Sequence, residues 1–400
     1  MNLVLSVTAY PPAIGGAQLL MHHLARQFIA RHHVQVITQW DVQRTDWLLG
    51  ATLKAPRQAR AYEVDGVSVQ RITLSDETRR SLTPWVWAYY VVQGPALERI
   101  ADALAAQIAP LADRADLIHN CRIGREGLSY ASLKIARGRD VPFVLTPVHH
   151  PRWGGWLHRH YHRLYRQADA VIALTGAERQ TLVELGVDRR RVCVTGMGPV
   201  LAGAHDGARF RAHYDLGDDP LVLFLAQKYP YKGLAALLEA TRLVWRRLPE
   251  ARFAFVGPRT AHSRRLFAGG CDARVLELGT VSLQEKTDAL AACEVLCVPS
   301  SQESFGAVYL EAWVLGKPVI GGNAPAVAEV ITDGVDGFRV GPQPAEIAGR
   351  VIALLTNPGL RERMGRAGRA KAQRFTWPAL AARTEAVYQA LLEGRWPADV

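Results

Sequence analysis

The sequence predicts an α/β protein with two domains, each built on a parallel β-sheet. Its 400 residues exceed the size at which one hydrophobic core stops growing, so two domains of roughly 150 to 200 residues are expected. Short apolar runs alternate with helical stretches, which is the pattern of parallel sheets covered on both faces. Turn-forming residues cluster near 197–220 and separate two such series. We therefore place an N-terminal domain at 1–200, a C-terminal domain at 215–375, and at 376–400 a last helix able to pack back on the first domain.

The predicted strands are short runs rich in β-branched residues. The first series contains the runs 3–7, 34–38, 116–119, 143–146 and 170–174. The second series contains the runs 221–225, 253–256, 275–278, 295–298, 318–320 and 338–340. Ligands of open parallel sheets bind beyond the carboxyl ends of the strands, and two such domains facing each other would form an interdomain cleft. Functional residues are therefore expected in loops that follow strands.

Composition indicates a cytoplasmic globular protein with an anionic partner. The chain is 49% hydrophobic and 21% charged, and no run approaches the roughly 20 apolar residues of a membrane span. The first residues read as a buried strand and not as a signal peptide. Five cysteines without a CxxC pair fit a reducing compartment. The net charge of +11 suggests a phosphosugar, a lipid surface or a nucleic acid as partner.

The most informative segment is 299–313, Pro-Ser-Ser-Gln-Glu-Ser-Phe-Gly-Ala-Val-Tyr-Leu-Glu-Ala-Trp, which follows a predicted strand. Ser304 and Gly306 suit a helix start, whose free N–H groups and positive dipole end bind phosphate. The helix is apolar on almost every face, so Glu311 should be buried and held by hydrogen-bond donors.

The spacing of Glu303 and Glu311 argues against a hydrolase. If all steps between them were helical, the two would lie about 12 Å apart, which exceeds the separation of two carboxylates acting on one glycosidic bond. They are expected to bind different parts of one extended ligand. The alternative is a salt-bridged helix glutamate and an unrelated loop glutamate.

The arrangement of Glu303, seven intervening residues and Glu311, with Ser304, Phe305 and Gly306 between, resembles the signature of the retaining glycosyltransferase family 4. The resemblance implies the GT-B fold, in which two Rossmann-like domains face each other. It also implies that Glu311 binds the ribose hydroxyls of a nucleotide. Glu303 and the backbone amides that follow it would contact the donor sugar.

Two lysines follow the first strand of the second domain. The segment 224–233, Phe-Leu-Ala-Gln-Lys-Tyr-Pro-Tyr-Lys-Gly, places Lys228 and Lys232 where they could neutralise a departing diphosphate. Members of the family usually have arginine at the first position. Lys228 therefore departs from the pattern, losing the bidentate geometry but keeping the charge. A solvated lysine pair is the alternative.

Two further loops carry weaker signals. Gly15 and Gly16 follow the first strand in a segment that resembles the family's Pro-Pro-x-x-Gly-Gly loop over the donor phosphates, although such a turn commonly just starts a helix. Val281 lies in Gly-Thr-Val-Ser at 279–282, which resembles the segment whose backbone meets the nucleobase. The alternative interpretation of the segment 279–282 is an ordinary strand-to-helix turn with Ser282 as the N-cap.

A histidine pair follows the predicted strand 143–146. A histidine just past a strand end can hydrogen-bond a sugar hydroxyl or an acceptor. Relatives often carry a histidine in this loop near the donor sugar. His150 matches the Thr-Pro-x-x-His form, but His149 is equally available, so both are retained as candidates.

The sequence lacks the motifs of a dehydrogenase and of a metal-dependent transferase. The dehydrogenase glycine fingerprint fails at the third glycine in 196–201, and no Asp-x-Asp motif offers a carboxylate cage for a donor-bound metal ion. His158 and His162 lie one helical turn apart, but no acidic or cysteine residue is near them, so we interpret them as surface residues. Neither a metal nor another cofactor is expected.

The stretch 152–166 is basic and aromatic. It either lies on an anionic membrane or forms a helix that packs its aromatic residues inward. An aromatic run at 85–90 supports a lipid-linked or amphipathic acceptor. The aromatic residues concerned are Trp153, Trp156, Tyr161, Tyr165, Trp85, Trp87, Tyr89 and Tyr90. This stretch makes peripheral contact with the inner membrane face an alternative to a purely cytoplasmic location.

Together these residues favour a metal-independent, retaining glycosyltransferase of polysaccharide or glycolipid biosynthesis. It would transfer a sugar from a nucleotide-diphosphate sugar to a glycolipid, lipid-linked or saccharide acceptor, and nucleic acid is not expected as a partner. The alternatives are a nucleotide-sugar epimerase of the same fold and a non-catalytic anion-binding surface protein.

Overall fold

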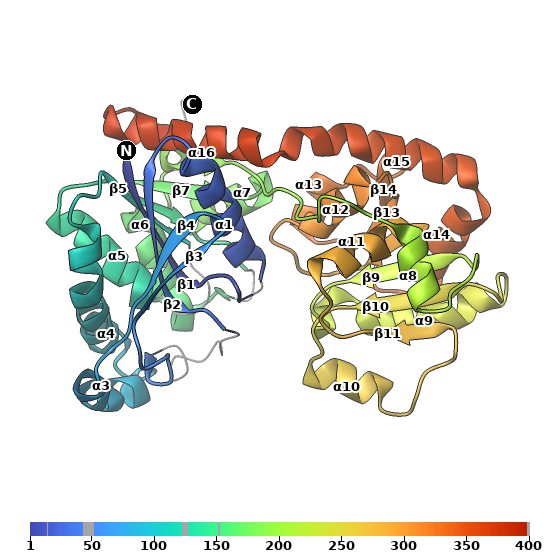
Figure 1. The fold of residues 1–400 in the computed structure, drawn as a ribbon, viewed down its shortest axis with the longest axis horizontal. Coiled ribbons are helices and arrows are strands. Elements are labelled where there is room, and N and C mark those ends of the chain that lie inside the picture. The colour runs from blue at the N-terminus through green and yellow to red at the C-terminus, as the bar shows by residue number, and fades with distance from the viewer. Residues whose placement is uncertain (14, 43–51, 122–126, 151–152, 398–400) are drawn as a thin grey trace. The chain divides into compact units, whose positions relative to one another are not determined.

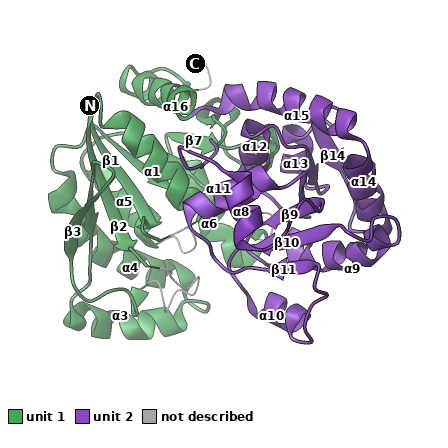
Figure 2. Ribbon diagram, turned by 45° about the vertical axis from the view of Figure 1, so that its right-hand side comes forward, with its two compact units in different colours: residues 1–197, 377–400 green, residues 198–376 purple. Residues whose placement is uncertain are grey.

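The computed structural model describes residues 1–397 except 14, 43–51, 122–126 and 151–152. The chain divides into two compact units, residues 1–197 with 377–400 and residues 198–376 (Figure 2). Each unit is built on one sheet whose strands are joined mainly by helices (Figure 1). The predicted α/β class with parallel sheets in two domains is confirmed, and every run predicted as a strand corresponds to one.

Unit 1 contains an eight-stranded sheet in the order β3-β4-β2-β1-β5-β6-β7-β8. The strands are β1 Asn2–Ala9, β2 His33–Trp40, β3 Arg60–Val64, β4 Val67–Arg71, β5 Leu117–Cys121, β6 Phe143–Thr146, β7 Ala170–Ala173 and β8 Val192–Val194. All neighbours pair in parallel except β3 and β4. The order reverses between β1 and β5, which places the loop after β1 at a ligand-binding position of such sheets.

The hairpin of β3 and β4 was not predicted. β3 is an edge strand with mostly exposed side chains, so its apolar pattern is weak. The signal that could have found it is the turn Asp65-Gly66, because both residues have positive φ, as two-residue hairpin turns require. The strand β8 was also not predicted; it is the other edge strand of the sheet, and only Val192 of its three residues is buried.

The main helices of unit 1 cover both faces of its sheet. They are α1 Gly16–Phe28, α3 Asp76–Ala88, α4 Gln93–Ile108, α5 Gly127–Gly138, α6 Arg159–Gln167, α7 Gly176–Glu184 and α16 Trp377–Leu392. Helix α1 packs with α16, and α4 packs with α5. Because right-handed crossovers leave β1 and β5 in opposite directions, α1 and α5 lie on opposite faces.

Buried polar contacts attach the C-terminal helix α16 to unit 1. The His119 ring on β5 bonds through Nδ1 to the Tyr388 hydroxyl at 2.5 Å and through Nε2 to the Thr146 hydroxyl at 2.8 Å. Near the start of β2, His32 lies 2.8 Å from a carboxylate oxygen of Glu385. Groups buried this deeply require partners, so these contacts fix the position of α16.

His119 makes the stability of unit 1 sensitive to acid. Burial lowers the pKa of His119 from 6.5 to about 3, so below pH 6.5 the unfolded chain binds a proton that the folded protein does not. Stability is therefore lost as the pH falls, by about 2 kcal/mol between neutrality and about pH 5. Urea unfolding of the wild type and of His119→Gln at both pH values measures this difference. The exposed His33→Gln is the control and should keep the wild-type dependence, and an equal dependence in His119→Gln would contradict the assignment.

Unit 2 contains a six-stranded, fully parallel sheet in the order β11-β10-β9-β12-β13-β14. The strands are β9 Leu221–Leu225, β10 Arg252–Val256, β11 Val275–Glu277, β12 Val295–Val298, β13 Val319–Gly321 and β14 Gly337–Arg339. The helices are α8 Gly207–His213, α9 Leu234–Trp245, α10 Ala261–Phe267, α11 Leu283–Ala292, α12 Ala307–Val314, α13 Pro325–Val330, α14 Pro344–Thr356 and α15 Pro358–Ala372. The order reverses between β9 and β12, where doubly wound sheets bind ligands.

Candidate functional site

The loops after β9 and β12 meet at this reversal point of unit 2. The backbone N–H of Ser301 donates to the carbonyl of Tyr231 at 2.8 Å. Gly233 has φ +78°, and a Cβ at this position would lie 2.3 Å from the carbonyl oxygen of Pro299. Only glycine permits so close an approach of the two backbones. The lysine motif and the double-glutamate motif, which are far apart in sequence, therefore form one site.

Lys232 and Glu303 form an ion pair across these loops. Lys232 Nζ lies 2.6 Å from Glu303 Oε1, and both side chains are mostly buried. Lys232 ends the short 3₁₀ helix Pro230–Lys232, whereas Glu303 lies in the β12–α12 loop. An ammonium group carries three N–H donors, so this ion pair leaves donors of Lys232 for a ligand anion.

The segment after Glu303 is not helical as far as Gly306. Helix α12 begins at Ala307, and its N-cap Gly306 has the left-handed φ of +90°. A Cβ on Gly306 would lie 2.5 Å from the ring of Tyr309. The separation of about 12 Å derived from a continuous helix therefore does not apply to Glu303 and Glu311. Between Glu303 and Gly306, Phe305 is buried and Ser304 is half-buried.

Glu311 is buried, as predicted, at 4% exposure. Its Oε1 accepts from Lys286 Nζ at 2.9 Å and from the Val200 N–H at 3.2 Å, while Lys286 Nζ also donates to the Val200 carbonyl at 2.6 Å. Its Oε2 is buried and accepts no hydrogen bond from any residue that the structure describes. A buried carboxylate oxygen without a donor is costly, so this atom suits a ligand hydroxyl.

Sequence reasoning missed Lys286, which holds Glu311. It lies on α11 one turn after the N-cap Ser282. Nothing in the sequence connects this lysine with Glu311, because the contact depends on the packing of α11 with α12. Ser282 itself accepts from the Glu285 N–H at 3.1 Å, so the predicted N-cap is confirmed. Val281, just before it, is half-buried.

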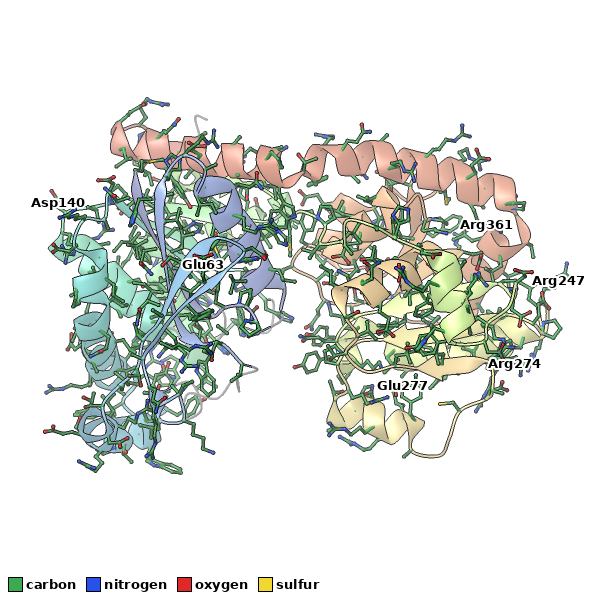
Figure 3. All side chains as sticks on the ribbon, viewed as in Figure 1. Glu63, Asp140, Arg247, Arg274, Glu277 and Arg361 are labelled. Carbon is green, nitrogen blue, oxygen red and sulfur yellow. The ribbon has the colours of Figure 1, made fainter. Side chains whose placement is uncertain are left out.

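Lys228 differs from Lys232 in its burial and in its partners. Its side chain is 0% exposed, and its ammonium donates to the Glu277 carboxylate and the Leu278 carbonyl at the end of β11. Glu277 is labelled in Figure 3. Burial lowers the pKa of Lys228, whereas Glu277 acts in the opposite direction. Arg259 pairs with the other oxygen of Glu277 at 2.7 Å. Lys228 is therefore not part of a solvated lysine pair, and its role at a diphosphate stays a prediction.

Lys228→Met tests whether Lys228 has a structural role. Breaking a buried ion pair costs about 3 kcal/mol where a second cation such as Arg259 remains. A structural role predicts that the urea midpoint of unit 2 falls accordingly, while the donor KM changes little. Lys317→Met, which replaces a half-buried lysine just before β13, is the control. A raised donor KM with unchanged stability would instead place Lys228 at the diphosphate.

In unit 1, Gly15 and Gly16 open helix α1, with Gly15 as the N-cap. The hairpin of β3 and β4 holds the preceding loop, because the Tyr62 hydroxyl donates to the Pro11 carbonyl at 3.0 Å. The predicted loop includes residue 14, which lies outside the described residues.

A hydrogen-bonded chain reaches the same loop from the hairpin turn. The Tyr10 hydroxyl lies 3.0 Å from His22 Nδ1, and His22 Nε2 lies 2.9 Å from the Asp65 carboxylate. Burial lowers the pKa of His22, which favours the neutral ring that accepts on one nitrogen and donates from the other. His22 and Asp65 were not predicted, because their contact depends on the unpredicted hairpin.

The structure distinguishes His149 from His150 by exposure. His149 is buried, with its Nδ1 3.3 Å from the Tyr165 hydroxyl, whereas His150 is half-buried. Both follow Val148, which has φ +48°, an outlier for a β-branched residue. The Glu178 carboxylate accepts from the His149 N–H at 2.5 Å, and burial raises the pKa of Glu178 to about 7. His150 is thus the more accessible of the two.

The basic aromatic stretch packs much of its aromatic surface inward. Tyr161 and Tyr165 of α6 are buried, whereas Trp156 and Leu157 just before α6 are exposed. Arg152 lies outside the described residues. Over the described ranges, no group of three potential metal ligands occurs, and no helix is long and apolar enough to cross a bilayer.

Two family models match the chain. "Glycosyl transferases group 1" matches residues 208–371, and "Glycosyl transferase 4-like domain" matches residues 15–198. The two matches together span most of both units. The chain belongs to the group 1 glycosyltransferases. The family resemblance found in the two glutamates of the β12–α12 segment is thereby confirmed.

Relatives of this glycosyltransferase include enzymes named for inositol-containing acceptors. The phosphatidyl-myo-inositol mannosyltransferase of Mycobacterium tuberculosis is 36% identical over 175 residues, which are 42% of this chain and 46% of that protein. The D-inositol 3-phosphate glycosyltransferase of Kribbella flavida is 32% identical over 243 residues, 56% of this chain and 57% of that protein. The chain thus spans about half the length of the curated relatives it matches.

Solved structures show the fold of this glycosyltransferase over nearly its whole length. Anabaena Alr3699/HepE in complex with UDP-glucose aligns with a TM-score of 0.76 at 19% identity, covering 98% of this chain and 100% of that chain. Sucrose-phosphate synthase from Thermosynechococcus elongatus aligns with a TM-score of 0.73 at 18% identity, with the same coverage. These similarities show the GT-B fold.

Proposed function

We propose that the protein transfers a sugar from a nucleotide-diphosphate sugar to a hydroxyl acceptor, with retention of configuration and without a metal ion. The observation that carries the proposal is the site at the reversal point of unit 2. There a mostly buried cation, Lys232, is paired with Glu303, and the buried Glu311 offers an oxygen without a donor. Membership of the group 1 glycosyltransferases supports this interpretation.

The donor binds mainly to unit 2 in this proposal. The ribose hydroxyls donate to Oε2 of Glu311, and Lys286 orients that carboxylate through its contact with Oε1. The diphosphate contacts Lys232 and the free N–H groups at the start of α12. Val281 and its neighbours contact the base through their backbone, while Ser304, Phe305 and Gly306 supply amides near the sugar.

The chemical step is a substitution at the anomeric carbon. The bond from this carbon to the phosphate oxygen breaks, and the electron pair goes to that oxygen, where Lys232 stabilises the developing charge. The acceptor oxygen forms the new bond on the same face of the sugar. Its proton passes to the departing phosphate oxygen. Lys232 supplies the positive charge that a metal ion provides in other transferases.

The sugar is held by Glu303 and by His150 or His149, and the Gly15-Gly16 loop contacts the donor phosphates. The acceptor belongs to the glycolipid, lipid-linked or saccharide class. The names of the inositol-specific relatives support an acceptor with a polyol or phospholipid head group. A cytoplasmic enzyme that reaches a lipid-linked acceptor would contact the inner membrane face peripherally, through the exposed residues of the stretch 152–166, which include Trp156 and Leu157.

Thermal stabilisation tests the donor side. The purified protein is melted without added metal in the presence of UDP, GDP, ADP, CMP or nicotinamide dinucleotides. A ligand at a concentration 100 times its Kd stabilises the folded protein by about 2.7 kcal/mol, so one nucleoside diphosphate should raise the melting temperature selectively. A shift with a dinucleotide, or no shift at all, would overturn the proposal.

Product analysis separates transfer from epimerisation. One solved structure of this fold is named a putative UDP-N-acetylglucosamine 2-epimerase from Listeria monocytogenes, with a TM-score of 0.65 at 15% identity. A labelled sugar that appears on an added acceptor supports the transferase. An interconverted nucleotide sugar without transfer would support the epimerase.

A further inference from the structure

An exposed apolar surface occurs in unit 1 where α3 turns into α4. Val91 is 82% exposed and Trp87 is 71% exposed, and Tyr90 and Val92 beside them are also exposed. The sequence from 81 to 97 contains no charged residue. Large apolar side chains exposed side by side, without a charge among them, are unusual on the surface of a soluble domain and mark an interaction site.

A second exposed segment adjoins this turn. Trp156 is 62% exposed, and Leu157 next to it is also exposed. The Gln93 side chain at the start of α4 donates to the Leu157 carbonyl at 3.4 Å. The two segments therefore form one surface, which we call the aromatic patch. It comprises Trp87, Tyr90, Val91, Val92, Trp156 and Leu157.

The charge beside the aromatic patch is positive. The guanidinium of Arg159 lies 3.6 Å from the ring centroid of Trp156, and Arg163 is exposed one turn farther along α6. The sequence contains no acidic residue from 153 to 168. The nearest acids on α4, Glu98 and Asp102, are both paired with Lys134.

We infer that the aromatic patch docks the protein on a membrane surface that contains anionic lipids. Tryptophan and tyrosine lie favourably at the boundary between head groups and acyl chains, and arginine beside them attracts anionic head groups. Arginine beside the patch and the absence of acidic residues from 153 to 168 favour an anionic lipid surface as the occupant. The contact is made by the α3–α4 turn and by Trp156 and Leu157, because Tyr161 and Tyr165 of α6 are buried.

The inference rests on the proposed function in one respect: the membrane contact serves to bring the enzyme to a lipid-linked acceptor. Vesicle binding is measured without donor or acceptor. If the protein binds vesicles but transfers no sugar, the proposed function alone is overturned. If the enzyme is active but does not bind vesicles, the inference alone is overturned.

Flotation of the full chain with lipid vesicles tests the inference. Vesicles of phosphatidylcholine with about one third phosphatidylglycerol should bind the protein, and pure phosphatidylcholine vesicles should bind it several-fold more weakly. Trp87→Ser and Leu157→Ser should each weaken binding roughly tenfold. Arg163→Gln should weaken it about fivefold, since one basic residue near an anionic surface contributes about that factor.

Matched controls exclude general effects of the substitutions. Trp396→Ser and Val335→Ser replace exposed apolar residues elsewhere, and Arg114→Gln replaces an exposed arginine outside the patch. These variants should bind vesicles like the wild type, and all variants should keep the wild-type melting temperature. Equal binding of patch and control variants overturns the inference. If the wild type binds no vesicles and the patch variants change the oligomeric state in sedimentation, the aromatic patch is instead an interface with a second copy of the chain.

Discussion

Glu311→Gln is expected to weaken use of the donor by roughly 30- to 1,000-fold in kcat/KM, with most of the loss in the donor KM. Two ribose hydroxyls that donate to an ionised carboxylate contribute about 2–4 kcal/mol in total. Glutamine keeps the size of the side chain but replaces the charged acceptor by a weaker one. Initial rates at varied donor concentration, together with calorimetric titration of the nucleoside diphosphate, measure the effect.

The exposed Glu239→Gln on α9 of the same unit is the matched control and should behave like the wild type. Melting curves are required as well, because Glu311 also pairs with Lys286 and receives the Val200 N–H. If Glu311→Gln keeps the native melting profile and turns over donor at the wild-type rate, the ribose lies elsewhere and the proposed site is wrong.

Lys232→Ala is expected to lower kcat by about 10²- to 10³-fold, with a smaller effect on the donor KM. The loss of one preorganised cation or donor at a developing anion has this magnitude, because the interaction is stronger in the transition state than in the ground state. Lys232→Arg should recover part of the activity, since it keeps the charge but changes the geometry. Single-turnover rates at saturating donor measure the chemical step directly.

The ion pair with Glu303 requires its own control. Removal of Lys232 leaves Glu303 mostly buried without its cation, so part of any loss could come from a displaced loop. The double variant Lys232→Ala with Glu303→Gln removes that unpaired charge. If the double variant regains wild-type kcat, Lys232 acts only by holding the loop. Lys317→Ala, before β13, is the matched lysine control and should keep the wild-type rate.

The sequence alone determined the buried sheet strands and the candidate residues of the site, but not the β3–β4 hairpin or β8. Buried parallel strands are nearly continuous apolar runs, so β6, β9 and β12 could be read with their observed bounds. The burial of Glu311 followed from the apolar helix around it. The loops carrying Lys232, Glu303 and the two histidines followed from their position after strands. All of these are local properties of a few consecutive residues.

Only the tertiary structure decided which charged groups meet. Lys228 and Lys232 lie four positions apart in one loop, yet one is buried on Glu277 and the other pairs with Glu303. The side chain at 228 turns back to the end of β11, which the order of strands brings beside β10. In the same way Lys286 reaches Glu311 because α11 and α12 pack together. Such pairings depend on the packing of elements distant in sequence, which local patterns do not encode.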